Sequence, residues 1–230
     1  MKSFDAQLLR SLLQSRLQLV NMRRDASNQV RGALKVFGIV LPAGRPSTFD
    51  RIAREYLGSR VELSTFIEPL LAAWKSLGEQ VAQLDKRLRQ IAKERPVVQR
   101  LMGVPGVGIV IGLAFVATLD DPQRFAKLRN VGAHLGLAPR RFQSGEMDRQ
   151  GSISNPGDPL MRHYLYEAAG VLLTRTKRWS TLKAWGVRLT KRIGASKAKV
   201  AVARKLAIIL HRMWLTGESF RWGVEAEVAV

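Results

Sequence analysis

The sequence predicts a mainly α-helical fold, in which long coiled-coil helices are followed by a helical domain that contains a helix-hairpin-helix. Apolar residues recur at spacings of three and four through most of the 230 residues, which is the period of an amphipathic helix. No region shows the pattern of a strand-rich domain. Hydrophobic residues make up 46% of the chain, enough to form a core in one or two domains.

The first helix is expected over residues 4–37. Its leucines and valines fall on one face, while arginines such as Arg16 and Arg23 lie on the polar side. Gly38 is expected to end the helix, because glycine readily adopts the left-handed conformation found just after helix C-termini. The segment LPAGRPS that follows predicts a loop.

The second long helix carries the most regular apolar pattern in the chain. Spacings of three and four alternate through Ile67, Leu70, Trp74, Leu77, Val81, Leu84, Leu88 and Ile91. This is the a/d pattern of a coiled coil, and it is expected to end near Pro96. The pattern leaves open whether the partner is residues 4–37 of the same chain or a second subunit. Residues 1–96 are therefore predicted to be a linking helix and coiled-coil region.

Residues 97–119 predict a helix-hairpin-helix. Two apolar segments flank the turn Gly103–Gly108, in which Gly106 and Gly108 allow a tight bend and expose N–H groups at the start of the second helix. Such a motif binds the phosphate backbone without recognising sequence. We place a helix-hairpin-helix domain at residues 97–222 and a flexible tail at residues 223–230.

Three further segments complete the predicted order of elements. Residues 123–136 are expected to be helical, residues 137–155 irregular or hairpin-like, and residues 196–215 helical with Ser196 as N-cap. The acidic pair before Pro122 is interpreted as a helix cap, not as a metal site. The histidines lack metal-ligand spacing, so no metal site is predicted in this chain.

The positive charge of the chain predicts a polyanionic partner. There are 38 lysines and arginines against 18 aspartates and glutamates, which gives a net charge of +20. Between Glu167 and Glu218 there are twelve basic residues and no acid, so this stretch is expected to follow a phosphate backbone. Within it, Lys197, Lys199, Arg204 and Lys205 are expected to contact nucleic acid, and so is Arg162, which lies just before it.

Other classes of protein are disfavoured by what the chain lacks. No apolar run reaches membrane-spanning length, and residues 1–10 have no signal-peptide core. Cysteine is absent, which excludes disulfides and thiolate-metal sites and is compatible with the cytoplasm.

The segment APRRFQSGEMDRQGSIS, residues 138–154, has two interpretations. Ser144 and Gly145 form a common turn dipeptide, so the segment can be an ordinary surface turn. Alternatively, Ser144 is a nucleophile, and Arg140 and Arg141 neutralise the charge of the phosphate that it attacks.

Four segments in order resemble the C-terminal part of one family of insertion-sequence transposases. They are LMGVPGVGIVIGLAFVATLDDPQRF, VGAHLGLAPRRFQSGE, GSISNPGDPLMRHYLYEAAGVLL and ARKLAIILHRMW. That family pairs an acidic DEDD-type domain with a serine and includes the bridge-RNA-guided recombinases. The resemblance implies that Ser144 bonds covalently to DNA while strands are cut and rejoined, and that Gly145 lies beside it.

The resemblance also implies partners and a location. DNA is the expected partner, a structured guide RNA is a further candidate, and a homodimer or higher homo-oligomer is expected without membrane association. The chain is expected in the cytoplasm of a bacterium or archaeon, at the nucleoid.

One departure from the family concerns the acidic domain, which is expected to be missing because the sequence starts where the linking helix should start. The chain is then expected to bind no cofactor, to leave Mg²⁺ to that domain, and to be an inactive transposase when alone. Two alternatives remain open. One is a non-catalytic helix-hairpin-helix protein that binds DNA junctions or structured RNA, and the other is a dimerising fragment that interferes with the full-length enzyme.

Overall fold

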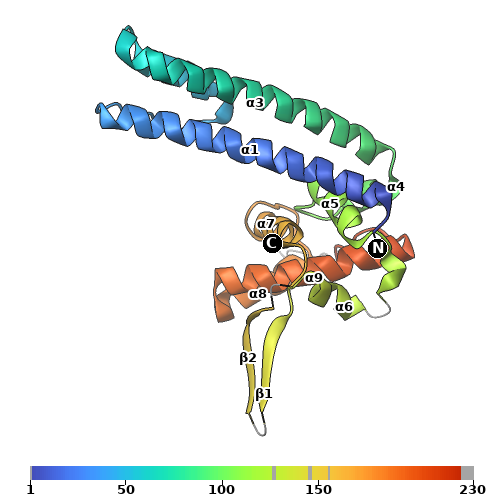
Figure 1. Cartoon of the computed structure of the whole chain (residues 1–230). Coiled ribbons are helices and arrows are strands. Elements are labelled where there is room, and N and C mark those ends of the chain that lie inside the picture. Colours follow the sequence, from blue (N-terminus) through green and yellow to red (C-terminus); the bar gives the residue numbers. More distant parts are fainter. Residues whose placement is uncertain (1, 126–127, 145–146, 155, 224–230) are drawn as a thin grey trace, which may run out of the picture. The chain divides into compact units, whose positions relative to one another are not determined.

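The computed structural model describes residues 2–223 except 126, 127, 145, 146 and 155 (Figure 1). The described chain is mainly α-helical, which confirms the predicted fold class. The helices are α1 Phe4–Val36, α2 Phe49–Leu57, α3 Val61–Lys93, α4 Pro96–Leu101, α5 Ile109–Leu119, α6 Leu128–His134, α7 Pro159–Thr174, α8 Thr181–Ile193 and α9 Ala195–Thr216. Two 3₁₀ turns, η1 Pro46–Thr48 and η2 Pro122–Arg124, and two strands, β1 Pro139–Ser144 and β2 Met147–Ile153, complete the order.

The chain folds into two compact units. The helical-pair unit contains residues 11–87, and the hairpin unit combines residues 1–10 with residues 88–230. The domain boundary expected at residue 96 was based on sequence motifs and stays a prediction. The compact units of the structure meet instead after residues 10 and 87. The difference arises because the start of α1 and the end of α3 are buried among the elements of the hairpin unit, as at Leu9 and Leu88.

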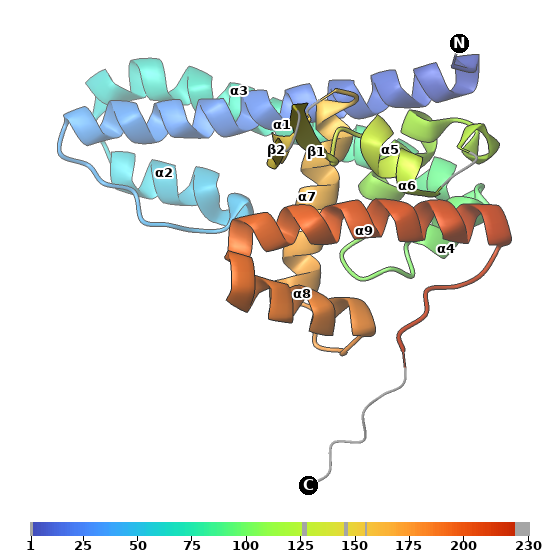
Figure 2. The same cartoon turned by 90° about the horizontal axis from the view of Figure 1, so that it is seen from below.

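In the helical-pair unit, α1 and α3 lie side by side in opposite directions, and α2 packs against them (Figures 1 and 2). The buried cluster that joins them contains Val30, Leu34, Leu41, Phe49, Ala53, Leu57, Leu63, Ile67, Leu71 and Trp74. Gly38 has a φ of 77°, and the amides of Gly38 and Ile39 donate to the carbonyls of Lys35 and Leu34. This Schellman-type closure ends α1 where the sequence predicted.

The heptad positions of α3 are buried to two different degrees. Ile67, Trp74, Val81 and Leu88 are at most 9% exposed. The alternate positions Leu70, Leu77, Leu84 and Ile91 are only half-buried. Packing within the chain therefore covers one row of the seam more fully than the other, and a coiled coil with a second subunit stays a prediction.

In the hairpin unit, α9 is the central helix and packs against α4, α6, α7 and α8. The face of α9 that these helices cover includes Ala198, Val202, Ala203, Leu206, Ala207 and Leu210. Small and medium apolar side chains on one stripe let several helices approach the same axis closely. The prediction that Ser196 caps this helix is wrong. Gly194, with a φ of 83°, ends α8 and directly precedes α9, so no linker remains to hold a cap.

The segment expected to be irregular or hairpin-like is an antiparallel β-hairpin. Arg141 pairs with Gln150 and Ser144 with Met147, and a register irregularity lies between Pro139 and Arg141. At the base, the amide of Ser154 donates to the carbonyl of Ala138 over 2.8 Å. Figure 1 shows the two strands extending away from α8 and α9 as a narrow ribbon.

The helix predicted over residues 123–136 is divided in the structure. The turn η2 occupies its start and α6 its end. Asp121 accepts a hydrogen bond from the amide of Gln123 at 2.8 Å, so the capping interpretation is confirmed for Asp121, whereas Asp120 accepts from Ser3. Pro122 at the first position of η2 fits this arrangement, because proline lacks the amide that would need a partner there.

Candidate nucleic-acid interface

Ser144 is the last residue of β1 and is exposed. It lies next to residues 145 and 146, which connect the strands, at the end of the hairpin farthest from the helices of its unit (Figure 1). A serine in this position is accessible to a substrate as large as a DNA strand. Gly145, which was predicted to lie beside it in the nucleic-acid site, is outside the described residues.

The two arginines before Ser144 also lie on β1. Arg140 is exposed, and its Nη2 atom lies 3.5 Å from the carbonyl oxygen of Ser154, at the outer limit of a hydrogen bond. Such a contact restrains the guanidinium weakly, so Arg140 remains accessible to a phosphate. Arg141 takes part in the ladder opposite Gln150, and its side chain is outside what the structure describes.

A groove of about 920 Å³ lies where the base of the hairpin meets α8 and α9. We call it the basic groove, and its lining residues are Leu137, Pro139, Gly151, Ile153, Trp185, Ile193, Lys197, Val200, Ala201, Arg204, Lys205 and Ile208. Its walls are mostly apolar, and three cationic side chains of α9 stand among them. Cations attract a phosphate backbone, whereas apolar and aromatic side chains can contact sugars and bases.

Three of the four predicted basic residues of α9 line this groove, and the fourth does not. Lys197, Arg204 and Lys205 belong to the lining. Lys199 points instead toward α7, where its Nζ lies 5.4 Å from the centre of the Tyr166 ring. Arg204 packs close to Gly132 of α6, since a Cβ atom added at this glycine would lie 3.1 Å from the Cγ of Arg204. The run of basic residues is therefore split between two faces of one helix.

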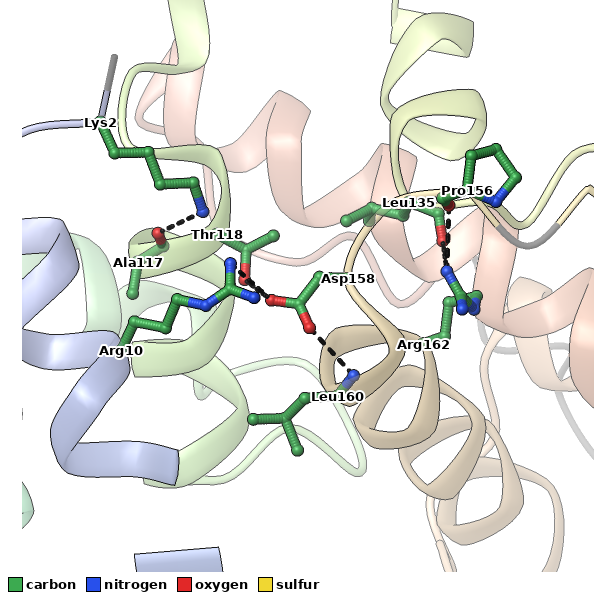
Figure 3. Close-up of polar contacts among 9 residues, drawn as sticks. All are labelled: Lys2, Arg10, Ala117, Thr118, Leu135, Pro156, Asp158, Leu160 and Arg162. Carbon is green, nitrogen blue, oxygen red and sulfur yellow. Dashed lines mark hydrogen bonds and ion pairs between the residues drawn. The ribbon is translucent and has the colours of Figure 1, made fainter. Parts of the chain in front are cut away.

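Arg162 supports the base of the hairpin from inside the unit. Its Nη1 donates to the carbonyl oxygens of Leu135 at 3.3 Å and Pro156 at 3.0 Å (Figure 3). One carbonyl precedes β1 and the other follows β2, so this guanidinium joins the two ends of the hairpin. Its predicted contact with nucleic acid stays a prediction, while the observed bonds give it a positioning role.

Gly157 fixes the same region through its backbone. It has a φ of 92°, and a Cβ atom at this position would lie 2.1 Å from the carbonyl oxygen of His134. Only glycine permits this approach, because any side chain would collide with backbone at a φ that L-residues avoid. The segment after β2 is thereby locked against the end of α6.

Asp158, for which the sequence predicted no role, is the centre of a buried polar network (Figure 3). Its carboxylate caps α7 by accepting the amide of Leu160 at 2.9 Å, and it also accepts the hydroxyl of Thr118 at 3.4 Å. Arg10 forms an ion pair with it at 3.1 Å. The pattern of an aspartate directly before Pro159 could have indicated the cap, but nothing in the sequence indicates Arg10.

The first residues of the chain attach to the end of α5 through further polar contacts. Lys2 donates to the carbonyl of Ala117 at 3.2 Å (Figure 3), and burial is the main cause that lowers its pKa, followed by the charge of Arg10. Asp120 accepts the hydroxyl and the amide of Ser3, each at 2.6 Å, and these bonds lower its pKa. The contacts tie residues 2 and 3 to the hairpin unit.

The two glycines of the predicted helix-hairpin-helix have different surroundings. Gly106 has a φ of 86°, and a Cβ atom there would lie 2.4 Å from the carbonyl of Ala168, so this glycine allows α7 to approach the turn. Gly108 is exposed and precedes α5, whose N-terminus has no side-chain cap. Its uncapped amides are the ones that the hypothesis of phosphate binding requires. Contact of either glycine with nucleic acid stays a prediction.

The described residues do not form a metal site. Nowhere in the described ranges do three or more histidine, cysteine, aspartate or glutamate side chains come together as ligands. His211 is buried and its Nε2 lies 2.7 Å from the carbonyl of Pro122. The donor set present here therefore does not fit the magnesium ions that the resemblance assigns to an acidic domain.

Comparison with known proteins bears on the same region. Residues 98–184 match the model of the Transposase IS116/IS110/IS902 family. This range contains the turn before α5, both strands of the hairpin with Ser144, and α7. None of the described helices has the length and apolarity needed to cross a membrane.

Curated relatives match almost all of the chain. It is 28% identical to the transposase for insertion sequence element IS1111A of Coxiella burnetii, over 96% of this chain and 62% of the relative. It is 31% identical to the putative transposase y4pF/y4sB of Sinorhizobium fredii, over 96% of this chain and 58% of the relative. It is 29% identical to a probable family 20 transposase of Pseudomonas aeruginosa, over 96% of this chain and 68% of the relative.

The predicted resemblance to insertion-sequence transposases is confirmed at this level, and the chain spans about three fifths of the length of the first two relatives. The resemblance to bridge-RNA-guided recombinases and the missing acidic domain stay predictions.

Proposed function

We propose that this chain is a DNA-binding, serine-bearing region of an insertion-sequence transposase and belongs to the family whose model its central part matches. The observation that carries the proposal is the position of Ser144. It is exposed at the end of a hairpin whose base borders the basic groove, and the hairpin lies inside the matched range. We propose that this serine acts as a nucleophile and that the groove at the base of the same hairpin binds phosphates.

The chemistry assigned to Ser144 is attack on a phosphodiester. Its Oγ loses its proton and forms a bond to phosphorus, the bond from phosphorus to one sugar oxygen breaks, and that oxygen takes up a proton and leaves as a hydroxyl. Negative charge increases on the non-bridging oxygens as the new bond forms, and the guanidinium of Arg140 can neutralise it. The chain is thus proposed to supply the nucleophile and cations.

The remaining requirements are assigned to another part of the transposase. The described residues offer no cluster of carboxylates that could hold a metal ion. The family resemblance implies an acidic domain with Mg²⁺, which when bound would offset charge on the reacting oxygens. We therefore propose that the chain binds DNA by itself but needs that domain for cleavage.

The length of the hairpin predicts the spacing between the bound strand and the cut. From Pro139 at the groove to Ser144 at the tip, the strand covers about 17 Å at roughly 3.3 Å per residue. A DNA strand advances about 3.4 Å per nucleotide. The phosphate attacked by Ser144 is therefore proposed to lie about five nucleotides from the phosphates held in the groove.

The experiment that tests the proposal measures a covalent protein–DNA adduct. Labelled DNA that carries insertion-element ends is incubated with the chain, Mg²⁺ and the acidic domain of a relative, supplied in cis or in trans. A denaturing gel should show an adduct that Ser144→Ala abolishes while DNA affinity changes little, because one hydroxyl adds little to binding through many cations. Ser154→Ala, which removes a hydroxyl from the same segment, should retain the adduct. An adduct in Ser144→Ala, or cleavage by the chain without the acidic domain, contradicts the proposal.

A second function from a different class is favoured by the uncapped start of α5 after Gly108. A helix N-terminus of this kind can hold a backbone phosphate without any chemistry, as in a non-catalytic protein that binds DNA junctions or structured RNA. This function predicts that Gly108→Pro weakens binding and that no adduct forms under any condition. A dimerising fragment that interferes with the full-length enzyme predicts inhibition of transposition by the added chain, without an adduct.

A further inference from the structure

A second cationic site lies in the helical-pair unit, within residues 11–87. It is a pocket of about 290 Å³ between α1, α3 and the segment that joins α1 to α2. We call it the arginine pocket, and its lining residues are Val20, Arg23, Arg24, Ser27, Arg31, Gly44, Arg45, Pro46, Phe49, Trp74 and Val81. Four of these residues are arginines and none is acidic.

Arg23 lines this pocket and packs against an aromatic ring. Its Cζ lies 4.0 Å from the centre of the Trp74 ring, in cation–π geometry. A Cβ atom at Gly78 would lie 2.9 Å from the same Cζ, so glycine leaves the space that the guanidinium occupies. Glycine in a helix interior costs about 1 kcal/mol relative to alanine. The position of Arg23 gives a physical reason for this glycine in the middle of α3.

The Nε–H of Arg23 is buried and has no hydrogen-bond acceptor among the described residues. A buried donor without a partner is unfavourable, and it is more so on a charged group. Burial against an aromatic ring supplies attraction for the cation but no acceptor. An anionic ligand bound in the pocket would offset the positive charge of this guanidinium.

Arg31 lines the pocket and binds the backbone of the segment that joins α1 to α2. Its Nη1 donates to the carbonyls of Leu41 and Pro42, each at 3.2 Å, and its Cζ lies 5.1 Å from the centre of the Phe49 ring. These bonds fix the segment that carries Gly44, Arg45 and Pro46 to the pocket.

The other two arginines remain accessible. Arg45 is exposed, and Arg24 is exposed with a long 3.5 Å ion pair to Asp25, also exposed. Exposed pairs of this kind contribute little and are readily exchanged for another anion. The pocket thus combines two fixed guanidinium groups with two accessible ones.

The lining identifies the chemical class of the ligand. Guanidinium groups bind phosphate oxygens in bidentate geometry. A bare phosphate would leave the apolar part of the lining, such as the half-buried Val20, without contacts. A phosphate that carries a sugar and a flat base would cover it, and guanidinium planes and aromatic rings are the surfaces on which bases stack. A volume near 300 Å³ is at the lower end for small-molecule sites and suits a ligand of about that size.

We propose that the arginine pocket binds one nucleotide of a single-stranded nucleic acid. Arg24 and Arg45 hold the phosphate at the mouth, and Arg23 faces the ligand from its position on Trp74. This site is separate from Ser144 and from the basic groove, and it extends the proposed function by a second contact with nucleic acid. Failure of the serine chemistry would leave it untouched.

The test uses the full chain with Lys197, Arg204 and Lys205 changed to Gln, so that binding in the basic groove is suppressed. The probes are AMP, inorganic phosphate and a short oligo(dT) strand, and the readout is quenching of tryptophan fluorescence. Each nucleotide probe should quench, and Trp74→Phe should remove the change. Arg24→Gln with Arg45→Gln should weaken binding of AMP and oligo(dT) about tenfold or more, as loss of charged hydrogen bonds predicts.

Two controls make the result decisive. Lys35→Gln with Lys75→Gln removes the same charge from exposed positions of α1 and α3 outside the pocket lining and should change affinity by less than about threefold. Gly78→Ala should weaken AMP binding while circular dichroism shows the helices intact, because the added methyl group displaces Arg23. Equal loss in the lysine and arginine variants overturns the proposal. Binding of inorganic phosphate as tight as that of AMP also overturns it.

Discussion

Arg23 in the helical-pair unit lies against the Trp74 ring with its Nε buried, whereas Arg140 on the hairpin is exposed and its Nη2 lies 3.5 Å from the carbonyl oxygen of Ser154. The first cation has lost its side-chain freedom before any ligand arrives, and the second loses it only on binding. A preorganised cation favours a ligand of one shape. An unrestrained cation contributes charge to any phosphate backbone, with an affinity that depends steeply on salt.

The largest predicted effect is on the free energy of unfolding, and it compares one glycine of the hairpin unit with one glycine of the helical-pair unit. At Gly157, an added methyl group meets the backbone carbonyl of His134 at 2.1 Å, with a φ of 92°. At Gly78, it meets the movable end of the Arg23 side chain at 2.9 Å. Gly157→Ala should lower the free energy of unfolding by about 3 kcal/mol because backbone cannot move aside cheaply. Gly78→Ala should leave it unchanged or raise it by up to about 1 kcal/mol.

Urea unfolding followed by circular dichroism compares the two variants directly. Gly32→Ala, in α1 with open space around its missing Cβ, is a suitable control for the gain in helix propensity. Equal stability of Gly157→Ala and the unmodified chain would show that the close approach of Gly157 to the backbone of His134 does not contribute to stability.

The second prediction concerns the basic groove. Changing Lys197, Arg204 and Lys205 to Gln should lower the slope of log affinity against log salt for duplex DNA by up to about 2.7, at roughly 0.9 for each phosphate that is no longer neutralised. Between about 50 and 200 mM salt, that difference corresponds to roughly a fortyfold change in relative affinity. Fluorescence anisotropy at several salt concentrations measures it. Because the arginine pocket is proposed for a single strand, Arg24→Gln with Arg45→Gln should change the duplex slope less than the triple variant does.

A matched variant on the other face of α9 tests whether the salt dependence of DNA binding is determined by the position of a cation or only by the net charge of the chain. Lys199→Gln removes a cation that packs toward Tyr166 and does not line the groove. It should lower the slope by less than any single groove variant. An equal reduction for all four positions would mean that the net charge of the chain, and not the groove, determines binding.

The sequence predicted the helices well where periodicity and end signals agree. The span of α1 and its closure at Gly38 followed from local preferences, which act over a few residues. The hairpin was predicted only as one of two possibilities, because its strands are polar and lack the alternation that marks a buried face. Ser196 was misassigned because serine is a frequent cap, while the actual boundary depends on Gly194.

The candidate site was predictable only in part. The residue types around Ser144 allowed a surface turn or a nucleophile near cations, and the nucleophile stays a prediction. Three of the four basic residues of α9 that were predicted to contact nucleic acid line one groove. The apolar half of that groove, including Trp185, could not be predicted, because helical spacing alone does not say which apolar residues remain uncovered. The link between Arg10 and Asp158 joins residues far apart in sequence, and such pairs are set by tertiary packing.

The third prediction concerns self-association through α3. Leu77 and Leu84 belong to the half-buried row of the heptad seam. Leu77→Lys with Leu84→Lys places two charges on that row and should weaken homodimer formation at least about tenfold, since a charge in an apolar seam loses hydration. Sedimentation at tens of micromolar (about the range in which micromolar dimers form) measures the change. If the unmodified chain is a monomer at that concentration, the heptad seam of α3 packs only within its own chain.

The smallest predicted effect is a pH dependence at the base of the hairpin. Partial burial lowers the pKa of His134 from 6.5, with further repulsion from Lys2 and Arg124 and a smaller opposing attraction from Asp158. The unfolded chain therefore takes up this proton at higher pH than the folded chain. The contribution of His134 to the free energy of unfolding should fall as pH decreases through about 6.5, and it should become constant below the lowered pKa.

Urea unfolding at pH 7.5 and 5.5 isolates this effect when the loss of stability between the two pH values is compared for His134→Gln and the unmodified chain. His134→Gln should reduce that loss. The lowered pKa of Asp120 acts below about pH 3.8 and does not overlap this range. If His134→Gln and the unmodified chain lose the same stability on acidification, then the lowered pKa of His134 does not contribute to the pH dependence.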